Sequence, residues 1–154
     1  MGADEVQIFW DTFRSERPER ALPAEPGDVF AFGDSPEMAS ELGDLVRAGV
    51  KTATTSALWA YEPDEALPQV GELSVVLDGD NKPLCIIETT EVRTMTFAEV
   101  DAAFAFDEGE GDRSLAYWRG AHERFFTRTL SEIGKTFSET MPVVCERFKK
   151  VYPA

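Results

Sequence analysis

The chain has 154 residues, of which 43% are hydrophobic, and a formal net charge of −14. This length and composition suffice for one hydrophobic core, so we expect a single domain over residues 1–154. The negative charge argues against DNA and against a broad grip on long RNA, because affinity for nucleic acid comes largely from basic groups that neutralise phosphates.

Residues 1–28 are predicted to form a helix and a surface connection. In the first part, apolar residues recur at helical spacing: Val6, Phe9, Trp10 and Phe13. From Arg17 to Asp28 the chain is rich in Pro, Glu and Ala, which is typical of an exposed connection. We therefore expect the N-terminal helix to pack on the outside of the domain.

A second helix is predicted to begin at Ser35-Pro36 and to stop at Gly49. The Ser35 hydroxyl can cap the first turn, and proline suits the first helical position. Glycine suits the position just after a helix end. The residues expected to face the core are Met38, Leu42, Leu45 and Val46.

A strand is predicted after this helix, at residues 51–56, where β-branched side chains predominate. Side chains alternate between the two faces of a strand. Lys51, Ala53 and Thr55 are therefore expected on one face and the residues between them on the other.

The rest of the chain mixes strands and helices without the regular alternation of a parallel α/β fold. This order predicts the α+β class, with a mostly antiparallel, barrel-like sheet. Small and acidic residues at 107–112 predict a loop before the longest helix. Strands are predicted at 73–77, 84–92 and 142–152, a hairpin turn at 78–81, and helices at 97–104 and from Leu115 onward.

Cysteine usage and the apolar runs bear on the compartment. The N-terminus lacks a basic segment followed by an apolar run, and no apolar stretch approaches the ~20 residues of a membrane helix. We expect a cytoplasmic protein that does not contact membranes. Cys85 and Cys145 lie apart inside apolar runs, which predicts buried, reduced thiols rather than a disulfide or a zinc site.

Lys51 is the first candidate for chemistry, because it stands where a helix ends and a strand begins. A lysine held partly out of water loses some preference for its charged form and can act as a general base. Activated in that way, Thr54 could be a nucleophile. The alternative is an ordinary surface lysine at the start of an ordinary strand.

The acidic loop is the second candidate. Its glycines let the backbone approach a ligand, and Glu108 and Glu110 could orient a lysine or accept hydrogen bonds from a base or a ribose. Carboxylates also suit a hard metal ion, although the spacing does not match an EF-hand. The alternative is a solvated loop whose Asp112 caps the next helix.

Aromatic residues are the third candidate, since a ring that stacks on a base contributes ~1–3 kcal/mol. Trp59 and Tyr61 show no core periodicity, which leaves them free to line a pocket. Trp118 and the single histidine, His122, lie on the apolar side of the predicted helix, so core packing is the expectation for both.

These candidates coincide with a known family. Gly49-x-Lys51-x-x-Thr54 is similar to the G-x-K-x-x-[TE] signature of ASCH (activating signal cointegrator homology) domains. The chain also resembles the longer bacterial members over about Phe9 to Tyr152. The further blocks that carry the likeness are Phe32-Gly33-Asp34-Ser35-Pro36, the run from Glu108 to Leu115 before Tyr117-Trp118-Arg119, and Met141-Pro142-Val143-Val144.

The resemblance implies a PUA-like fold, a small β-barrel with surrounding helices that is related to RNA-binding domains. One branch of the family looks like an amidohydrolase that removes the acetyl group from N4-acetylcytidine with a lysine, a threonine and a glutamate. Lys51 and Thr54 match the first two, and either Glu108 or Glu110 can supply the third. The residues expected to contact the substrate are Ser56, Trp59, Tyr61, Arg113 and Ser114.

Three functions stay open at this stage. The first is hydrolysis of an amide on a modified pyrimidine nucleoside, without a cofactor. The second is a ribonuclease that resembles another branch, with Lys51 and Arg113 facing phosphate and a divalent metal such as Mn²⁺ held by the loop. The third is a non-catalytic module that recognises a nucleotide. The expected partner is a small nucleoside or an RNA nucleotide in each case, and the sequence does not indicate an oligomeric state.

Overall fold

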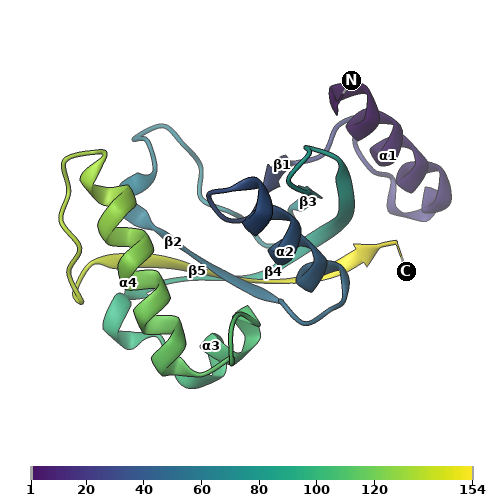
Figure 1. Ribbon diagram of the computed structural model, residues 1–154. Helices are drawn as coiled ribbons and strands as arrows, with labels where there is room; N and C mark the ends of the chain where they lie inside the picture. The colour runs from purple at the N-terminus through teal and green to yellow at the C-terminus, as the bar shows by residue number, and fades with distance from the viewer. Residues whose placement is uncertain (1, 154) are drawn as a thin grey trace.

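A curled sheet of five strands forms the centre of the fold, as Figure 1 shows. The structure, a computed structural model, describes residues 2–153 and the side chains from Glu5 onward. The strand order is β1-β3-β4-β5-β2. The strands are β1 (Asp28–Ala31), β2 (Ala53–Ala57), β3 (Leu73–Leu77), β4 (Pro83–Thr96) and β5 (Pro142–Tyr152), and the helices are α1 (Gly2–Glu16), α2 (Pro36–Arg47), α3 (Ala102–Glu108) and α4 (Leu115–Ser131).

The sheet is mostly antiparallel. The β3–β4, β4–β5 and β5–β2 pairs run antiparallel, and β1 runs parallel to β3. The strands β1 and β2 lie at the two edges and do not pair with each other. The curled sheet therefore stays open, as half a barrel. The predicted α+β class and PUA-like architecture are therefore confirmed, with the barrel open rather than closed.

Helices cover both faces of β3 and β4. Val75 and Ile86 pack with Trp10 of α1 on one face. Their sequence neighbours Val76 and Cys85 pack beneath α2 on the other face. Because side chains alternate between faces and both faces are covered, consecutive residues are apolar here, at 75–77 in β3 and 84–87 in β4.

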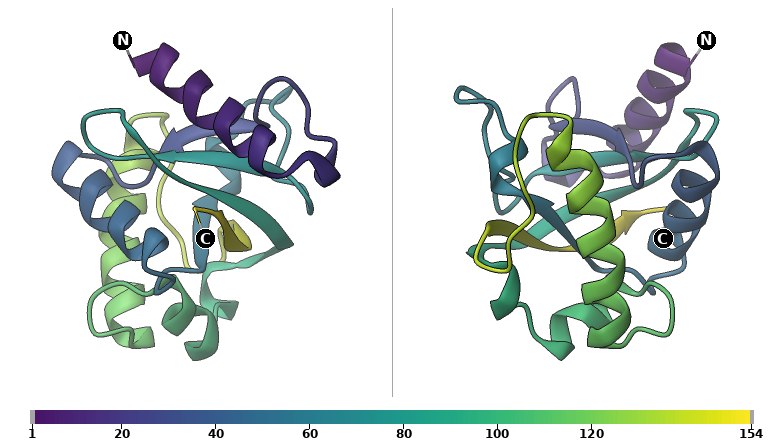
Figure 2. Two further views of the ribbon diagram at one scale, coloured as in Figure 1. Left: turned by 90° about the vertical axis from the view of Figure 1, so that its right-hand side faces the viewer. Right: turned by 60° about the vertical axis from the view of Figure 1, so that its left-hand side comes forward.

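The third part of the core lies at the other end of the molecule. There α3, α4 and the short 3₁₀ helix η3 (Phe97–Glu99) pack with β2 and β5. Figures 1 and 2 show α1 far from α3 and α4. The N-terminal helix is held by Trp10 and Phe13, which are fully buried, and the Trp10 indole N–H donates to the Pro23 carbonyl over 3.0 Å.

Local signals place the second helix correctly. The Ser35 hydroxyl accepts a hydrogen bond from the Met38 amide over 3.1 Å, and Pro36 is the first helical residue. After the helix end, Gly49 adopts the positive φ of 81° that glycine tolerates. Met38, predicted to face the core, is instead 40% exposed and lies over Gly33.

The predicted helix at 97–104 is wrong, because the chain forms two separate pieces there. Thr96 and Glu99 close a capping box around η3, and the Asp101 carboxylate then starts α3 by accepting from the Phe104 amide. Two successive caps stop one helix and start another. The strand β1 was not predicted, since its four residues lack a clear pattern.

Two further expectations concern the cysteines and membranes. Cys85 and Cys145 are free and buried, as predicted. Within residues 2–153, none of the helices is both long enough and apolar enough to cross a bilayer.

The cap at Ser35 gives a direct test of the α2 start. Ser35→Ala should lower the free energy of unfolding by about 1 kcal/mol, because the Met38 amide loses its partner. Urea denaturation measures the change. Ser15→Ala is the matched control, since that serine lies inside α1, is exposed, and bonds only to the Thr12 carbonyl of its own helix. An equal loss in both variants would contradict the capping role.

Candidate functional site

A pocket of about 140 Å³ brings together residues from α2, β2, α4 and the acidic loop. Its walls are mostly aromatic and aliphatic. The apolar lining consists of Phe32, Met38, Leu42, Tyr117, Ala121 and Phe125, together with Gly33. The polar lining consists of Lys51, Thr54, Thr55, Glu108, Glu110 and His122.

The turn after α2 positions Lys51. The amides of Val50 and Lys51 both donate to the Leu45 carbonyl, over 2.9 and 3.1 Å. This closes the helix and turns the chain inward. The next residue ties two other segments together, because the Thr52 amide donates to the Asp107 carbonyl and the Thr52 carbonyl accepts from the Phe148 amide. The Lys51 side chain is consequently held between β2 and the end of α3.

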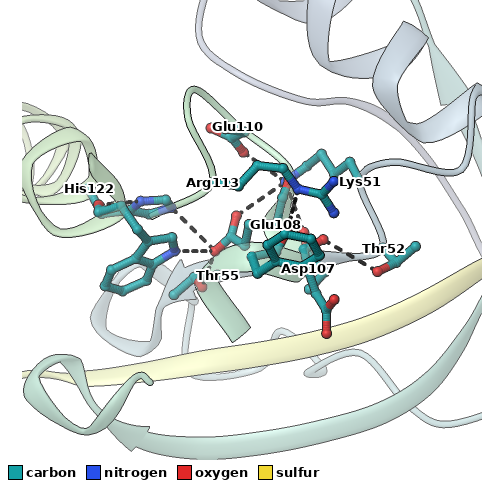
Figure 3. Close-up of polar contacts among 11 residues, drawn as sticks. Lys51, Thr52, Thr55, Asp107, Glu108, Glu110, Arg113 and His122 are labelled. Atoms are coloured by element: carbon teal, nitrogen blue, oxygen red, sulfur yellow. Dashed lines mark hydrogen bonds and ion pairs between the residues drawn. The ribbon is translucent and has the colours of Figure 1, made fainter. Parts of the chain in front are cut away.

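The Lys51 ammonium group is buried and surrounded by oxygen atoms. Its Nζ donates to the Glu110 carboxylate over 2.8 Å, the Glu108 carboxylate over 3.1 Å and the Ala53 carbonyl over 2.8 Å. The Glu108 carbonyl lies at 3.3 Å, and the Phe32 ring lies 5.3 Å away. Only 1% of the lysine side chain is exposed. Figure 3 shows this convergence.

Glu108 is the second fully buried member of the cluster. While its Oε1 faces Lys51, its Oε2 accepts from the Thr55 hydroxyl over 2.6 Å and from the Trp118 indole over 2.7 Å. The His122 Nε2 lies 3.5 Å from the same oxygen. Both carboxylate oxygens are thus occupied by protein groups (Figure 3).

These contacts set the protonation states. Burial by itself lowers the pKa of Lys51, but the charges of Glu108 and Glu110 outweigh it and raise that pKa above its usual value. Burial by itself raises the pKa of Glu108, yet Lys51, His122 and Thr55 hold that pKa well below its usual range. Lys51 is therefore an ammonium ion at neutral pH. These contacts favour the charged form of Lys51 over the neutral base expected from burial alone, because two carboxylates reverse the effect of desolvation.

The two glutamates differ in their access to the pocket. The side chain of Glu110 keeps 23% of its surface exposed, against 1% for Glu108. Its Oε2 binds Lys51, and Thr54 lines the same pocket. Glu110 and Thr54 are therefore the groups of the predicted Lys-Thr-Glu set that a ligand can reach most easily.

The acidic loop takes its shape from contacts with the protein. Gly109 ends α3 with a φ of 75°, and a Cβ atom there would lie 2.8 Å from the Val50 carbonyl oxygen. Gly111 lies flat against the Tyr117 ring. These glycines allow close packing of the loop on Lys51 and α4, rather than the approach of a ligand to the backbone that the sequence suggested.

Three of the predicted substrate contacts lie away from this pocket. The Ser56 hydroxyl bonds to the Tyr61 hydroxyl over 2.9 Å, and Tyr61 lines a different hollow beside Phe30 and Glu146. The Trp59 ring faces Lys135, whose Nζ lies 6.0 Å from the ring centre. Ser56 follows the buried Thr55 and points to the other face of the strand, and it lies farther along β2 than Thr54, which still lines the pocket.

The predicted contacts Arg113 and Ser114 have local roles. The Arg113 guanidinium lies 3.6 Å from the centre of the Phe106 ring, and its Nε donates to the Phe106 carbonyl. The Ser114 hydroxyl caps α4 by accepting from the Tyr117 amide. Asp112, expected as that cap, instead accepts from the Ser114 amide one step earlier.

The acidic loop does not form a metal-binding group. In the part of the chain that the structure describes, no three His, Cys, Asp or Glu side chains are arranged to hold a metal ion. Glu108 and Glu110 are directed at Lys51.

Comparison with known proteins assigns the family. Residues 28–152 match the sequence pattern of the ASCH domain. The chain belongs to the ASCH domain family. The resemblance inferred from the Gly49-x-Lys51-x-x-Thr54 signature is thus confirmed.

Solved structures support the same assignment. An ASCH domain from Lactobacillus crispatus is 38% identical, with a TM-score of 0.90 over 97% of this chain and 96% of that one. A protein from Enterococcus faecalis is 39% identical, with a TM-score of 0.86 over 97% of this chain and 89% of its own. A hypothetical protein that is 12% identical shares the fold alone, with a TM-score of 0.52 over 80% and 98% of the two chains. A search among curated proteins found no match.

Three residues that contact the Glu108 carboxylate were not predicted as site residues: Thr55, Trp118 and His122. A signal for Thr55 existed, because alternation places it on the same strand face as Lys51. The signal for Trp118 and His122 was their spacing of one helical turn, which puts an indole N–H and an imidazole on one side of α4. Both do pack against apolar neighbours, but their polar atoms require partners and find Glu108 and the Trp118 carbonyl.

The buried ion pair gives a test by double-mutant cycle. Lys51→Met should lower the free energy of unfolding by about 3–5 kcal/mol, because it leaves the Glu108 charge buried without its main partner. Adding Glu108→Gln removes that charge, so the double variant should be more stable than the sum of the two single effects predicts. Urea denaturation at neutral pH measures all four proteins.

Lys82→Met is the matched control for this cycle. That lysine pairs with Glu5 at the surface, so its replacement should change stability by no more than about 1 kcal/mol. Strict additivity of Lys51→Met and Glu108→Gln would contradict a coupled buried pair.

Proposed function

We propose that this ASCH domain binds the base of a nucleoside, or of a single unpaired RNA nucleotide, in the pocket at Lys51. The observation that carries the proposal is that aromatic side chains and one accessible carboxylate, that of Glu110, line the same pocket. The lysine beside them already donates its hydrogen bonds to protein oxygen atoms. The fold is PUA-like, an architecture often linked to RNA binding, which supports the same ligand class.

The aromatic walls suit a flat heterocycle. Phe32, Tyr117 and Phe125 line the pocket, and Tyr117 is partly open to solvent. A base can stack on such rings, whose contacts contribute ~1–3 kcal/mol each. Pockets for small ligands generally combine an apolar lining with a few polar groups that fix the orientation.

The polar groups favour a ligand that donates hydrogen bonds. Glu110 supplies a carboxylate, which only accepts when ionised. Among the described residues that line the pocket, Lys51 is the only lysine or arginine, and its Nζ faces four oxygen atoms. The pocket therefore suits the amino or imino groups of a base, and a phosphate attached to the ligand would have to remain outside.

The charge of the whole chain favours a small ligand. With a net charge of −14, the protein repels an extended polyanion, while a neutral nucleoside is unaffected. Binding of RNA weakens steeply with salt because counterions are released, and binding of a nucleoside does not. The salt dependence of affinity separates the two ligand classes.

Glu110 is the residue with which to test the binding proposal. Calorimetric titration with cytidine, uridine, adenosine and N4-acetylcytidine should find at least one ligand. Glu110→Gln should weaken its binding about tenfold or more, because a hydrogen bond to a charged group is replaced by one to a neutral amide. Glu123→Gln, an exposed change on α4, is the control and should bind normally. No binding of any of these nucleosides by the unmodified protein would refute the proposal.

A second candidate function is hydrolysis of an amide on a modified pyrimidine nucleoside such as N4-acetylcytidine. The observation that favours it is that Thr54, Lys51 and Glu110 line one pocket. In this scheme the Thr54 hydroxyl attacks the acyl carbon, its proton passes through Glu110 to the leaving amine, and water then hydrolyses the resulting ester. Lys51 takes part as a cation that holds the Glu110 carboxylate in place, rather than as the base.

The hydrolytic candidate is tested by product release. We expect the protein to release cytidine from N4-acetylcytidine, as measured by liquid chromatography, and Thr54→Val to reduce the rate about a hundredfold or more while binding persists. Thr94→Val, an exposed change on β4, is the matched control. Unchanged release by Thr54→Val would remove this threonine from the reaction, and binding without release would leave the binding function alone.

A further inference from the structure

The single histidine of the chain occupies an unusual position beside the buried ion pair. The imidazole of His122 lines the pocket and stacks on Trp118 with 4.3 Å between the ring centres and an angle of 20°. The Phe126 ring lies 5.8 Å away. The ring is therefore held in one orientation by its neighbours, which fixes where its two nitrogen atoms point.

Both nitrogen atoms of His122 face acceptors. Its Nδ1 lies 3.0 Å from the Trp118 carbonyl oxygen, which can only accept, so Nδ1 carries a proton. Its Nε2 lies 3.5 Å from Oε2 of Glu108. A neutral imidazole would direct the Nε2 lone pair at an ionised carboxylate, whereas an imidazolium directs an N–H at it. The geometry therefore selects the doubly protonated, cationic form.

The charges around His122 balance only in that form. The charged groups that face it from the packed elements are Glu108 at the end of α3, Glu110 in the following loop and, through Glu108, Lys51 before β2. With His122 protonated, two cations face two carboxylates. Without that proton, Lys51 alone must balance both glutamates.

We propose that His122 is a positioning residue of this pocket: its protonated ring holds Glu108, so that Lys51 is free to hold Glu110 in place for the ligand, and loss of that proton weakens ligand binding. The two carboxylates share one ammonium group, and the imidazolium supplies a second cation for Glu108. This inference rests on the proposed function, since the ligand is the nucleoside proposed above.

The direction of the pH dependence follows from the same contacts. Burial by itself lowers the pKa of His122, but the hydrogen bond and charge of Glu108 raise it above the usual 6.5. A histidine with a raised pKa contributes stability that is fully present below its unfolded value and is lost as the pH rises through the folded value. Ligand affinity should follow the same course.

The charge arrangement is tested first, without ligand. Because the chain contains one histidine, its ring signals in a two-dimensional NMR titration belong to His122. We expect a midpoint above 6.5 in the unmodified protein and a lower midpoint in Glu108→Gln, which keeps the shape and removes the charge. Glu123→Gln, exposed on the same helix, should leave the midpoint unchanged. A midpoint at or below 6.5, or one that Glu108→Gln does not lower, would overturn the inference.

The effect on the ligand is tested by the pH profile of binding. A nucleoside that binds and does not itself titrate between about pH 6 and 9 is used, so that the protein alone changes its charge. The affinity of the protein for this nucleoside should fall about fivefold as the pH rises through the titration midpoint of His122. This factor is the low end of the usual coupling between two ligands, which here are the proton and the nucleoside. His122→Gln, which keeps a hydrogen-bond donor but not the charge, should bind at the weaker level at every pH.

The outcomes separate the two proposals. A profile that is flat in the unmodified protein, or equally steep in His122→Gln, would overturn the positioning role while leaving nucleoside binding intact. Absence of binding at every pH would refute the proposed function and the ligand-linked part of this inference together, whereas the NMR titration would still decide whether Glu108 holds His122 in its charged form.

Discussion

The arrangement of this site depends on one buried ammonium group. Removing an ion from water costs several kcal/mol, which a protein must offset with close, well-directed partners. Lys51 obtains them from three segments: the start of β2 through the Ala53 carbonyl, the end of α3 through Glu108, and the loop beyond through Glu110. No one of these segments provides enough oxygen atoms alone. The buried charge of Lys51 therefore requires that the three segments come together, and this places the acidic loop over the pocket.

Glu108 and Glu110 have different roles, although they are only two residues apart in the sequence. Helix α3 ends at Glu108, so this side chain still points into the core, where Thr55 and Trp118 donate to it. After Gly109 the chain turns, and Glu110 reaches the same ammonium group from the solvent side. One carboxylate stabilises the buried lysine, and the other remains accessible to a ligand. A single glycine with positive φ separates these roles.

Local signals were sufficient to predict much of this structure, and distant pairings were not. The cap at Ser35, the stop at Gly49 and the alternation along β2 are properties of short segments, and the structure has all three. Which donors meet Glu108 depends on the packing of α4 against α3, and no short segment encodes that packing. Trp118 and His122 were read as core residues because they lie on the apolar face. Trp118 does lie in the core and also donates to Glu108, whereas His122 lines the pocket. The family signature supplied Lys51, Thr54 and a glutamate, but it could not show that buried carboxylates would keep the lysine charged.

The charge balance of the pocket also bears on the proposal that this strongly acidic protein binds a nucleoside. The net charge of −14 belongs to the chain as a whole, and salt screens exposed charges within about 10 Å at ordinary ionic strength. Inside the pocket, Lys51 and the protonated His122 face Glu108 and Glu110 at distances of 2.8–3.5 Å, where screening is weak. The site is thus locally neutral within an acidic molecule. A polyanion meets the exterior first and is repelled, whereas a neutral base meets aromatic walls and one carboxylate held in place. In the proposed function, selection between the two begins with the exterior charge and is completed by the hydrogen bonds of the pocket.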